Sequence, residues 1–282
     1  MPSSFHTLTI LAPGLLGASL GQAARARGLA RSIRVWARRA EVRLACAQSD
    51  WCDSAHADAQ EAAAGADLVV VCTPVEHIVP LAREVSPVCA EGAIITDVGS
   101  TKSRICREAA AVGGRAVFVG AHPMAGSEKS GMEHARADLF ENRTCIVTPL
   151  PSTPPAPVDR VVRFWADLGM RVKTVSPEEH DEIVAHVSHL PHLLASILSV
   201  QLAGKDPEWM SCAGQGLRDT TRIAAGHAGL WRSICAQNRE EILRAMEGFE
   251  EEWQRLRSAL HNQRDFELER LLERGKRFRD SL

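Results

Sequence analysis

The sequence predicts an α/β domain over residues 1–175, followed by an all-helical domain over residues 176–282. Three observations lead to this prediction. Short apolar runs alternate with longer helical patterns through the first half of the chain. A glycine-containing turn separates the first apolar run from the first helical pattern. In the last third of the chain, apolar residues recur at helical spacing.

The predicted strands are short apolar runs. The run at 68–72 (LVVVC) is continuous and β-branched, which is typical of a strand buried on both faces. Helical patterns such as 19–27 and 77–85 separate the runs, and this alternation favours parallel pairing with right-handed crossovers. The other predicted strands are 8–11, 33–36, 93–96, 116–119, 145–147 and 170–175.

The segment 149–157 (PLPSTPPAP) is too rich in proline for a central strand or a helix interior. It could be an interdomain linker or a surface loop. We favour the loop, because 158–168 has a helical pattern and 170–175 again looks extended. The first domain is therefore expected to end near Val175.

The rest of the chain is expected to be helical. Ser176, Pro177 and Glu179 form a helix start, because serine caps free amides, glutamate three residues later reaches back, and proline suits the first turn. A long apolar stripe on such helices needs a partner, either within the subunit or across a homodimer, and we favour the homodimer. The stripe comprises Leu230, Ile234, Ile242, Met246, Phe249, Trp253, Leu256 and Leu260, and 266–278 repeats the pattern.

Composition narrows the class of protein. The chain has 282 residues, 45% of them hydrophobic, and a formal net charge of −2, which fits a globular protein with no general attraction to nucleic acid or anionic membranes. Its 8 cysteines are scattered without a CxxC pair, as in a reducing compartment. The N-terminus lacks a signal-peptide pattern, and no stretch approaches the apolar length of a membrane helix. We expect a cytoplasmic protein that binds neither nucleic acid nor membrane.

A glycine turn at residues 12–17 (APGLLG) follows the first predicted strand and opens the first helix. The dinucleotide fingerprint GxGxxG uses glycines for the tight turn, for backbone approach to the pyrophosphate and for helix–strand packing. Ala12 stands at the first position, so the motif is degenerate, but the surrounding strand–helix–strand pattern is the one it requires. The alternative is a tight turn without a ligand. We expect a Rossmann domain whose helix start binds phosphate at Gly14, Leu15, Leu16 and Gly17.

The end of the second predicted strand favours NADP over NAD. NAD-selective sites usually place an acid about 20 residues after the fingerprint, where it binds the ribose 2′-hydroxyl. Ala37 stands there and cannot make that bond, and Arg38 and Arg39 follow it. A guanidinium beside the ribose suits a 2′-phosphate. The alternative, above all for Arg39, is a solvated basic loop at the start of a helix.

Two polar segments follow neighbouring predicted strands. DVGSTK (97–102) follows the fourth strand, and HPMAGSEKSG (122–131) follows the fifth. In such folds the carboxyl ends of the strands face the ligand crevice. The Ser100 hydroxyl and the His122 imidazole could bind a substrate hydroxyl there together. A neutral histidine can accept the hydroxyl proton as hydride leaves.

Seven motifs occur in order along the chain: APGLLGAS, CTPV, DVGSTK, GAHPMAGSEKSG, SHLPH, LRDTTRIA and LWRSICAQN. With these motifs the chain resembles the prephenate/arogenate dehydrogenase family of tyrosine biosynthesis, over almost its whole length. The resemblance implies an oxidative decarboxylation, in which the substrate ring gives a hydride to the nicotinamide, loses carbon dioxide and becomes aromatic. It implies that the enzyme chiefly orients the ring, takes the hydroxyl proton and holds the carboxylates.

The resemblance also implies roles for individual residues in an interdomain site. His122 would deprotonate the substrate hydroxyl and Ser100 would assist it, while Arg222 would bind a substrate carboxylate through both oxygens. Thr73 and Pro74, at the end of the third predicted strand, would line the nicotinamide ribose. The substrate-binding residues are expected to be Arg222, His192, His189, Ser127 and Glu128, with His192 favoured over His189.

Three histidines, His186, His189 and His192, stand three residues apart and raise the question of a metal site. They lack the HExxH pattern, and the reaction needs no metal, so we expect none. His186 is assigned to a helix face without a catalytic role. Lys102 is expected to cap a helix or to form a structural pair.

Substrate choice is expected to depend on one end of the substrate. Prephenate ends in a keto acid, whereas arogenate carries an ammonium there, so a nearby acid favours arogenate through charge pairing. Glu128, six residues after His122, is the candidate. We expect activity on arogenate, with or without activity on prephenate.

Two other functions remain open from the sequence. One is another two-domain NADP-dependent dehydrogenase, acting on a β-hydroxy acid or an imine, but it would have no reason to combine HPMAG with DTTRIA. The other is a non-catalytic NADP-binding sensor, which would not need Ser100, His122 and Arg222 together.

Overall fold

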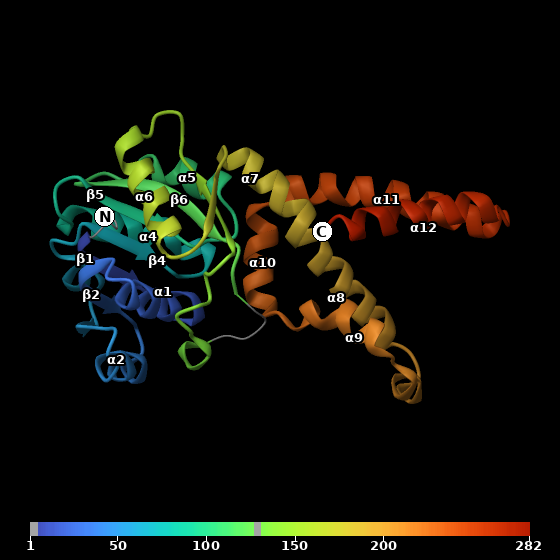
Figure 1. Cartoon of the computed structure of the whole chain (residues 1–282), viewed down its shortest axis with the longest axis horizontal. Helices are drawn as coiled ribbons and strands as arrows, with labels where there is room; N and C mark the ends of the chain where they lie inside the picture. Colours follow the sequence, from blue (N-terminus) through green and yellow to red (C-terminus); the bar gives the residue numbers. More distant parts are fainter. Residues whose placement is uncertain (1–4, 127–130) are drawn as a thin grey trace.

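The structure is a computed structural model that describes residues 5–126 and 131–282. Figure 1 shows a sheet with helices packed on it and, beside it, a group of helices that extends away from the sheet. The strands are β1 Phe5–Leu11, β2 Ala30–Trp36, β3 Ser54–His56, β4 Leu68–Val71, β5 Ala93–Asp97, β6 Ala116–Pro123, β7 Thr144–Thr148 and β8 Arg171–Thr174. The helices of this part are α1 Leu15–Ala26, α2 Ala40–Ala47, α3 Ala59–Ala63, α4 Val75–Val85, α5 Ser103–Ala109 and α6 Pro155–Asp167, with short 3₁₀ turns η1 Ser86–Val88 and η2 Met132–His134.

All these strands belong to one sheet, in the order β3-β2-β1-β4-β5-β6-β7-β8. The pairs are parallel, as expected, with one exception. The expectation of parallel pairing is wrong for β6 and β7, which run antiparallel. Because Gly120 to Pro123 pair with β7, β6 continues beyond the predicted end at Val119 and includes His122. His122 therefore lies within a strand and not after it.

Two apolar layers enclose the sheet. Consecutive strand residues point to opposite faces, so Val70 and Ile94 belong to one layer while Val69 and Ile95 belong to the other. Helices α1 and α6 cover the first face, and α3, α4 and α5 cover the second. Every residue of β4 is buried, which explains its unbroken β-branched sequence.

The proline-rich segment is a loop that leads into α6, as favoured from the sequence. The helix begins at Pro155, three residues before the predicted start, and prolines occupy its first turn. Proline is tolerated there because the first amides of a helix have no intrahelical acceptor. The chain then returns to the sheet as β8.

The second part is helical. Its start is the predicted one, since the Ser176 hydroxyl accepts a hydrogen bond from the Glu179 amide at 3.0 Å. The first three elements, α7, η3 and α8, form one continuous helix whose middle turn, η3, is π-helical. The elements are α7 Pro177–Val184, η3 Ala185–His189, α8 Leu190–Ala203, η4 Pro207–Cys212, α9 Gln215–Thr221, η5 Arg222–Ala225, α10 Ala228–Gln237, α11 Arg239–His261 and α12 Asp265–Asp280.

Helices α8, α11 and α12 expose large apolar side chains. Figure 1 shows α11 and α12 as a pair that projects away from the sheet, so the first domain does not cover them. Exposed apolar surfaces of this extent indicate a protein partner. The exposed residues on these helices include Ile197, Val200, Leu243, Trp253, Leu260, Phe266, Leu272 and Phe278.

The continuous helix from Pro177 to Ala203 is long and apolar enough to cross a membrane by length and composition alone. The expectation that no stretch reaches this length is therefore wrong. Its polar residues argue for a protein environment, because His180, Asp181 and His189 are buried against the rest of the chain. A core helix of a globular protein meets the same criterion as a membrane span.

Candidate active site

The turn after β5 and the end of β6 are tied together by one carboxylate. Asp97 Oδ2 accepts a hydrogen bond from the Gly99 amide at 2.8 Å, and Asp97 Oδ1 accepts one from the Ala121 amide at 3.1 Å. The Lys102 ammonium donates to the same carboxylate, and both side chains are completely buried. The backbones next to Ser100 and His122 are therefore held by one buried ion pair, which fulfils the expectation that Lys102 is structural.

His122 makes one of the contacts that join the two parts of the molecule. Its Nδ1 lies 2.8 Å from Nε2 of His180 on α7, and the two ring centroids are 5.1 Å apart. His180 Nδ1 in turn lies 2.8 Å from Asp181 Oδ1. The arrangement supports a site at the boundary between the sheet and the helical part.

The surroundings of His122 favour its neutral form. Burial lowers the pKa of His122 well below 6.5, and positive charge at His180, Lys102 or His189 would lower it further. An imidazole of this kind is uncharged at neutral pH and can accept a proton. This is the protonation state required of a base that removes a hydroxyl proton.

Asp181 links the helical part to the start of α5. Its two carboxylate oxygens accept hydrogen bonds from the Lys102 amide at 2.7 Å and the Ser103 amide at 2.9 Å. Burial alone would raise the pKa of Asp181, but the hydrogen bonds from His180 and Ser103 outweigh it, so the pKa lies below its ordinary value. Asp181 is therefore an ionised cap on α5 that also contacts His180.

His189 is buried at the end of the π-helical turn. The Asn238 amide donates to the Asp181 carbonyl oxygen at 2.8 Å and to His189 Nδ1 at 3.1 Å. Burial lowers the pKa of His189 to about 4, so the ring is neutral and carries its hydrogen on Nε2. The Nε2 atom is buried and makes no hydrogen bond of good geometry within residues 5–126 and 131–282, but the Ser100 backbone lies close enough to favour the protonated ring, so His189 faces the turn after β5.

His192 stacks on Trp231 from α10. The ring centroids are 3.5 Å apart with an interplanar angle of 9°. Gly226 closes over the pair, since an added Cβ would lie 2.6 Å from Trp231 Nε1 and 3.0 Å from His192 Cε1. His192 is buried, whereas His186 is exposed on the same helix, as expected.

The remaining substrate residues are placed differently. The Arg222 side chain is exposed in η5, a turn that packs on α8. Arg222 is therefore next to the helix of His192, and not within the His122 cluster. Ser127 and Glu128 lie outside the described residues.

The glycine turn has the shape of a phosphate site. Ala12 adopts φ 70°, the left-handed conformation that the first glycine of the fingerprint normally supplies. An added Cβ on Gly17 would lie 2.8 Å from the Ala12 carbonyl oxygen, so this glycine allows α1 to pack closely, whereas none of the described atoms lies within 4 Å of the corresponding position on Gly14. No described side chain caps α1. The amides of Leu15 and Leu16 begin the helix, which therefore presents uncapped donors and space for an anion.

The end of β2 presents the two arginines predicted to select the cofactor. Ala37 is buried, while Arg38 and Arg39 are exposed, and Arg39 lies 3.5 Å from Glu41. Arg43 donates to the carbonyl oxygens of Ala37 and Arg38 at 2.8 and 2.7 Å, so it fixes the shape of this turn. The residue pattern around Arg38 does not by itself distinguish Arg43.

Thr73 and Pro74 lie between β4 and α4. The Thr73 hydroxyl is buried without a hydrogen-bond partner among the described residues. A buried hydroxyl of this kind ordinarily has a partner, so a ligand is the natural acceptor or donor. Pro74 is exposed and precedes the first turn of α4. Both positions fit a nicotinamide nucleotide bound along this edge of the sheet.

Four residues of the cluster were missed by reasoning from the sequence: His180, Asp181, Trp231 and Asn238. Trp231 and Asn238 belong to a motif that carried the family resemblance, but the motif alone assigns them no contact. His180 and Asp181 follow the capping sequence of α7 and look like ordinary surface residues of a first turn. Only the packing of α7 against β6 brings them to His122.

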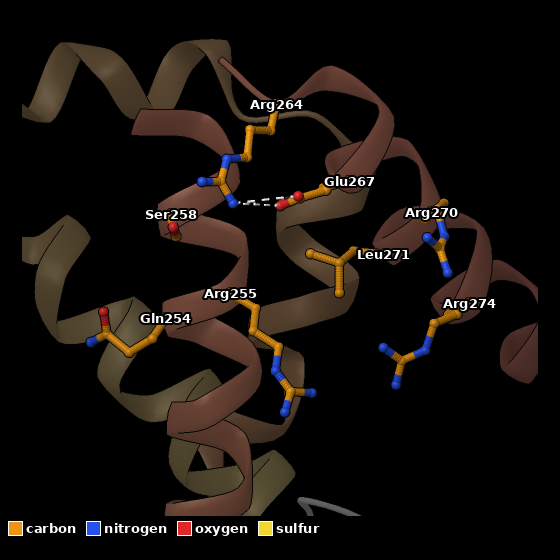
Figure 2. A pocket seen from close by; sticks show the side chains of 8 residues that line it. All are labelled: Gln254, Arg255, Ser258, Arg264, Glu267, Arg270, Leu271 and Arg274. Carbon is orange, nitrogen blue, oxygen red and sulfur yellow. Dashed lines mark hydrogen bonds and ion pairs between the residues drawn. The ribbon is translucent and has the colours of Figure 1, made fainter. Parts of the chain in front are cut away.

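A groove of about 500 Å³ lies elsewhere, between α11 and α12. Figure 2 shows arginine side chains around it, and three of them are paired with acids: Arg255 and Arg274 with Glu252, and Arg264 with Glu267. The groove contains none of the predicted site residues. Its remaining lining residues are Gln254, Ser258, Arg270 and Leu271.

Comparison with known protein families gives matches to both parts of the chain. The model described as prephenate dehydrogenase, nucleotide-binding domain, matches residues 20–174. The model described as prephenate dehydrogenase, dimerization domain, matches residues 176–274. The predicted fold class, a nucleotide-binding Rossmann domain followed by a helical dimerisation domain, is confirmed.

Individual relatives agree with these matches. A cyclohexadienyl dehydrogenase from Zymomonas mobilis is 30% identical over 277 residues, which cover 96% of this chain and 94% of the relative. The crystal structure of prephenate dehydrogenase from Aquifex aeolicus in complex with hydroxyphenyl propionate and NAD+ superimposes with a TM-score of 0.92 at 31% identity, covering 99% of this chain and 98% of that chain. The structure of Synechocystis arogenate dehydrogenase gives a TM-score of 0.84 at 28% identity, covering 98% and 99%.

Proposed function

The chain belongs to the prephenate dehydrogenase family, and from this premise we propose that it oxidises arogenate, with or without activity on prephenate, by hydride transfer to NADP. It is an oxidoreductase of tyrosine biosynthesis that carries out an oxidative decarboxylation. Family membership decides against the non-catalytic sensor and against the β-hydroxy acid or imine dehydrogenase. The observation that carries the proposed mechanism is the buried, neutral His122 near the carboxyl edge of the sheet.

We assign the base to His122. Its ring accepts the proton of the substrate hydroxyl while the carbon that bears this hydroxyl loses hydride. The bound nicotinamide supplies the hydride acceptor. The bond to the departing carboxylate then breaks, its electron pair enters the ring, and the proton returns to the oxygen of the new phenol. Ser100, in the turn after β5, assists by hydrogen bonding to the substrate and the cofactor.

We assign the two substrate carboxylates to side chains of the helical part. Arg222 is the bidentate partner for one of them, because its planar guanidinium matches a carboxylate. His192, held in place by Trp231, contributes a second polar contact, and the buried Nε2–H of His189, beside the Ser100 backbone, is a further donor. Ser127 and Glu128 complete the proposed set, with Glu128 pairing with the ammonium of arogenate.

We assign the cofactor to the edge of the sheet formed by the ends of β1, β2 and β4. The start of α1, at Gly14, Leu15, Leu16 and Gly17, binds the pyrophosphate. Thr73 and Pro74 line the nicotinamide ribose. Arg38, with Arg39, binds the 2′-phosphate that distinguishes NADP from NAD. The A. aeolicus enzyme was solved with NAD+, so this preference is a proposal for the present chain.

We further propose that the enzyme is a cytoplasmic homodimer whose domains divide after Val175. The match to a dimerisation domain and the exposed apolar side chains of α8, α11 and α12 support the homodimer. The division after Val175 falls between β8 and α7.

A four-way assay tests the substrate and cofactor proposals. The formation of reduced nicotinamide is followed with arogenate or prephenate, each with NADP or NAD. We expect the highest kcat/KM with arogenate and NADP. Strict preference for prephenate, or a higher kcat/KM with NAD, contradicts the corresponding proposal.

The role of Glu128 is tested separately. Glu128→Gln is expected to raise KM for arogenate and to leave KM for prephenate unchanged. Glu133→Gln, an exposed acid a few residues further along the chain, is the matched control. Equal effects of Glu128→Gln on both substrates contradict the charge-pairing role.

A further inference from the structure

Three side chains form a continuous hydrogen-bonded chain that ends at the proposed base. Asp181 Oδ1 lies 2.8 Å from His180 Nδ1, and His180 Nε2 lies 2.8 Å from His122 Nδ1. His180 is completely buried, and Asp181 and His122 are nearly so. The chain crosses from α7 to β6, so it depends on the packing of the helical part against the sheet.

The direction of each hydrogen bond follows from the ionised state of the Asp181 carboxylate. Its carboxylate accepts from the amides of Lys102 and Ser103, and the hydrogen bonds it receives lower its pKa, so it is ionised at neutral pH. An ionised carboxylate can only accept, so His180 Nδ1 must carry a hydrogen and donate it.

The position of the hydrogen on the His122 ring follows from its position on the His180 ring. Burial lowers the pKa of His180 below 6.5, so its ring is neutral and has one hydrogen, already placed on Nδ1. His180 Nε2 is therefore a bare acceptor, and the hydrogen between the two rings belongs to His122 Nδ1. This leaves His122 Nε2 without a hydrogen.

Other charged groups around the two rings favour the same arrangement. The buried Lys102 ammonium lies near both rings and disfavours a second positive charge on either of them. Asp97 neutralises this ammonium through a direct ion pair, and His189 is itself neutral because burial lowers its pKa to about 4. The local charge is therefore balanced when both His122 and His180 are uncharged.

We propose that His180 and Asp181 are positioning residues that hold His122 in the tautomer with hydrogen on Nδ1, so that Nε2 accepts the substrate hydroxyl proton. When His122 receives that proton, its Nδ1–H donates more strongly to His180, and His180 passes this polarisation to the Asp181 carboxylate. No further proton transfer is needed. The inference rests on the proposed role of His122 as the base, and it deepens that role by naming what sets its tautomer.

The tautomer can be read directly from the wild-type dimer. Protein labelled with ¹⁵N only in histidine is observed by long-range ¹H–¹⁵N correlation at neutral pH, and the His122 signals are assigned by their loss in His122→Gln. We expect a protonated Nδ1 and a bare Nε2 for both His122 and His180. A His122 ring with its hydrogen on Nε2 overturns the inference, whatever the activity of any variant.

Two substitutions at His180 separate positioning from a merely structural role. The Gln side chain can accept from His122 through its oxygen and donate to Asp181 through its nitrogen, whereas Leu can do neither. We expect His180→Leu to lower kcat on the order of 100-fold, the lower end of what a general base contributes, with KM for NADP unchanged. His180→Gln is expected to recover about 10-fold of that loss.

The matched control is His186→Leu, an exposed histidine on the same continuous helix, for which wild-type kcat is expected. Wild-type kcat in His180→Leu, or equal losses in His180→Leu and His180→Gln, overturns the inference. These outcomes are distinct from failure of the proposed function. If His122→Ala retains turnover, His122 is not the base, even where the ¹⁵N signals show the expected tautomer.

Discussion

Replacing Lys102 by methionine is expected to destabilise the sheet domain and to slow catalysis. Methionine keeps much of the aliphatic stem of lysine and removes the ammonium that neutralises Asp97. The substitution therefore leaves a carboxylate buried without its cation. Because Asp97 holds the backbone on either side of the site, next to Ser100 and next to His122, its displacement is expected to lower kcat as well.

The size of the effect follows from burial. The side chains of Lys102 and Asp97 are both 0% exposed, so solvent does not compensate for the lost charge. Removing one member of a buried ion pair costs about 3–5 kcal/mol. The lower end applies here, because Asp97 keeps its hydrogen bonds from Gly99 and Ala121 at 2.8 and 3.1 Å. At about 2–4 °C per kcal/mol for a domain of this size, Tm is expected to fall by roughly 6–12 °C.

Differential scanning calorimetry at one fixed protein concentration measures this change, since the stability of a dimer depends on concentration. The matched control is Arg104→Met, two residues further along in α5, whose side chain is 62% exposed and pairs with Glu108. An exposed pair contributes only about 0–1 kcal/mol. If Lys102→Met lowers Tm no more than Arg104→Met does, the buried pair does not stabilise the strand ends as described.

Three further predictions concern the cofactor, the base and the dimer. Arg38→Ser is expected to raise KM for NADP about 10-fold, the equivalent of one exposed charge-assisted hydrogen bond, and to leave KM for NAD unchanged; equal changes with both cofactors contradict the assignment. Because burial lowers the pKa of His122 well below 6.5, its active unprotonated form is already the main form at pH 6.5. The kcat/KM profile is therefore expected to be flat through pH 6.5 and to fall only at lower pH, and an acidic limb at or above pH 6.5 argues against His122 as the base. Trp253→Glu, on the exposed apolar face of α11, is expected to shift the dimer to monomer in gel filtration, whereas the neighbouring Gln254→Glu is not; an unchanged elution volume for Trp253→Glu contradicts this interface.

The fold was largely predictable because its signals are local. The continuous β-branched run of β4 and the capping sequence at Ser176 each reflect the residues that form the element. The antiparallel pairing of β6 with β7 was not predictable in this way. Strand direction depends on which segment reaches the edge of the sheet, and the apolar runs of the two strands carry no mark of their direction. The three-residue β3 is too short to give a period.

The site was predictable only in part. His122 and Ser100 could be identified as site residues because each lies in a motif near the end of a predicted strand. The partners of His122 could not be predicted, because His180 and Asp181 reach it through the packing of two segments 58 residues apart. The stacking of Trp231 on His192 has the same origin, since α10 and α8 meet only in the folded chain.

The most direct test of the central claim is the rate of reduced nicotinamide formation by His122→Ala, measured at saturating NADP and arogenate. The variant removes the base and leaves the glycine turn and the arginines at the end of β2 intact. The account predicts that kcat falls by about 10²- to 10⁴-fold while the affinity for NADP is unchanged. Turnover close to that of the wild-type enzyme would contradict it.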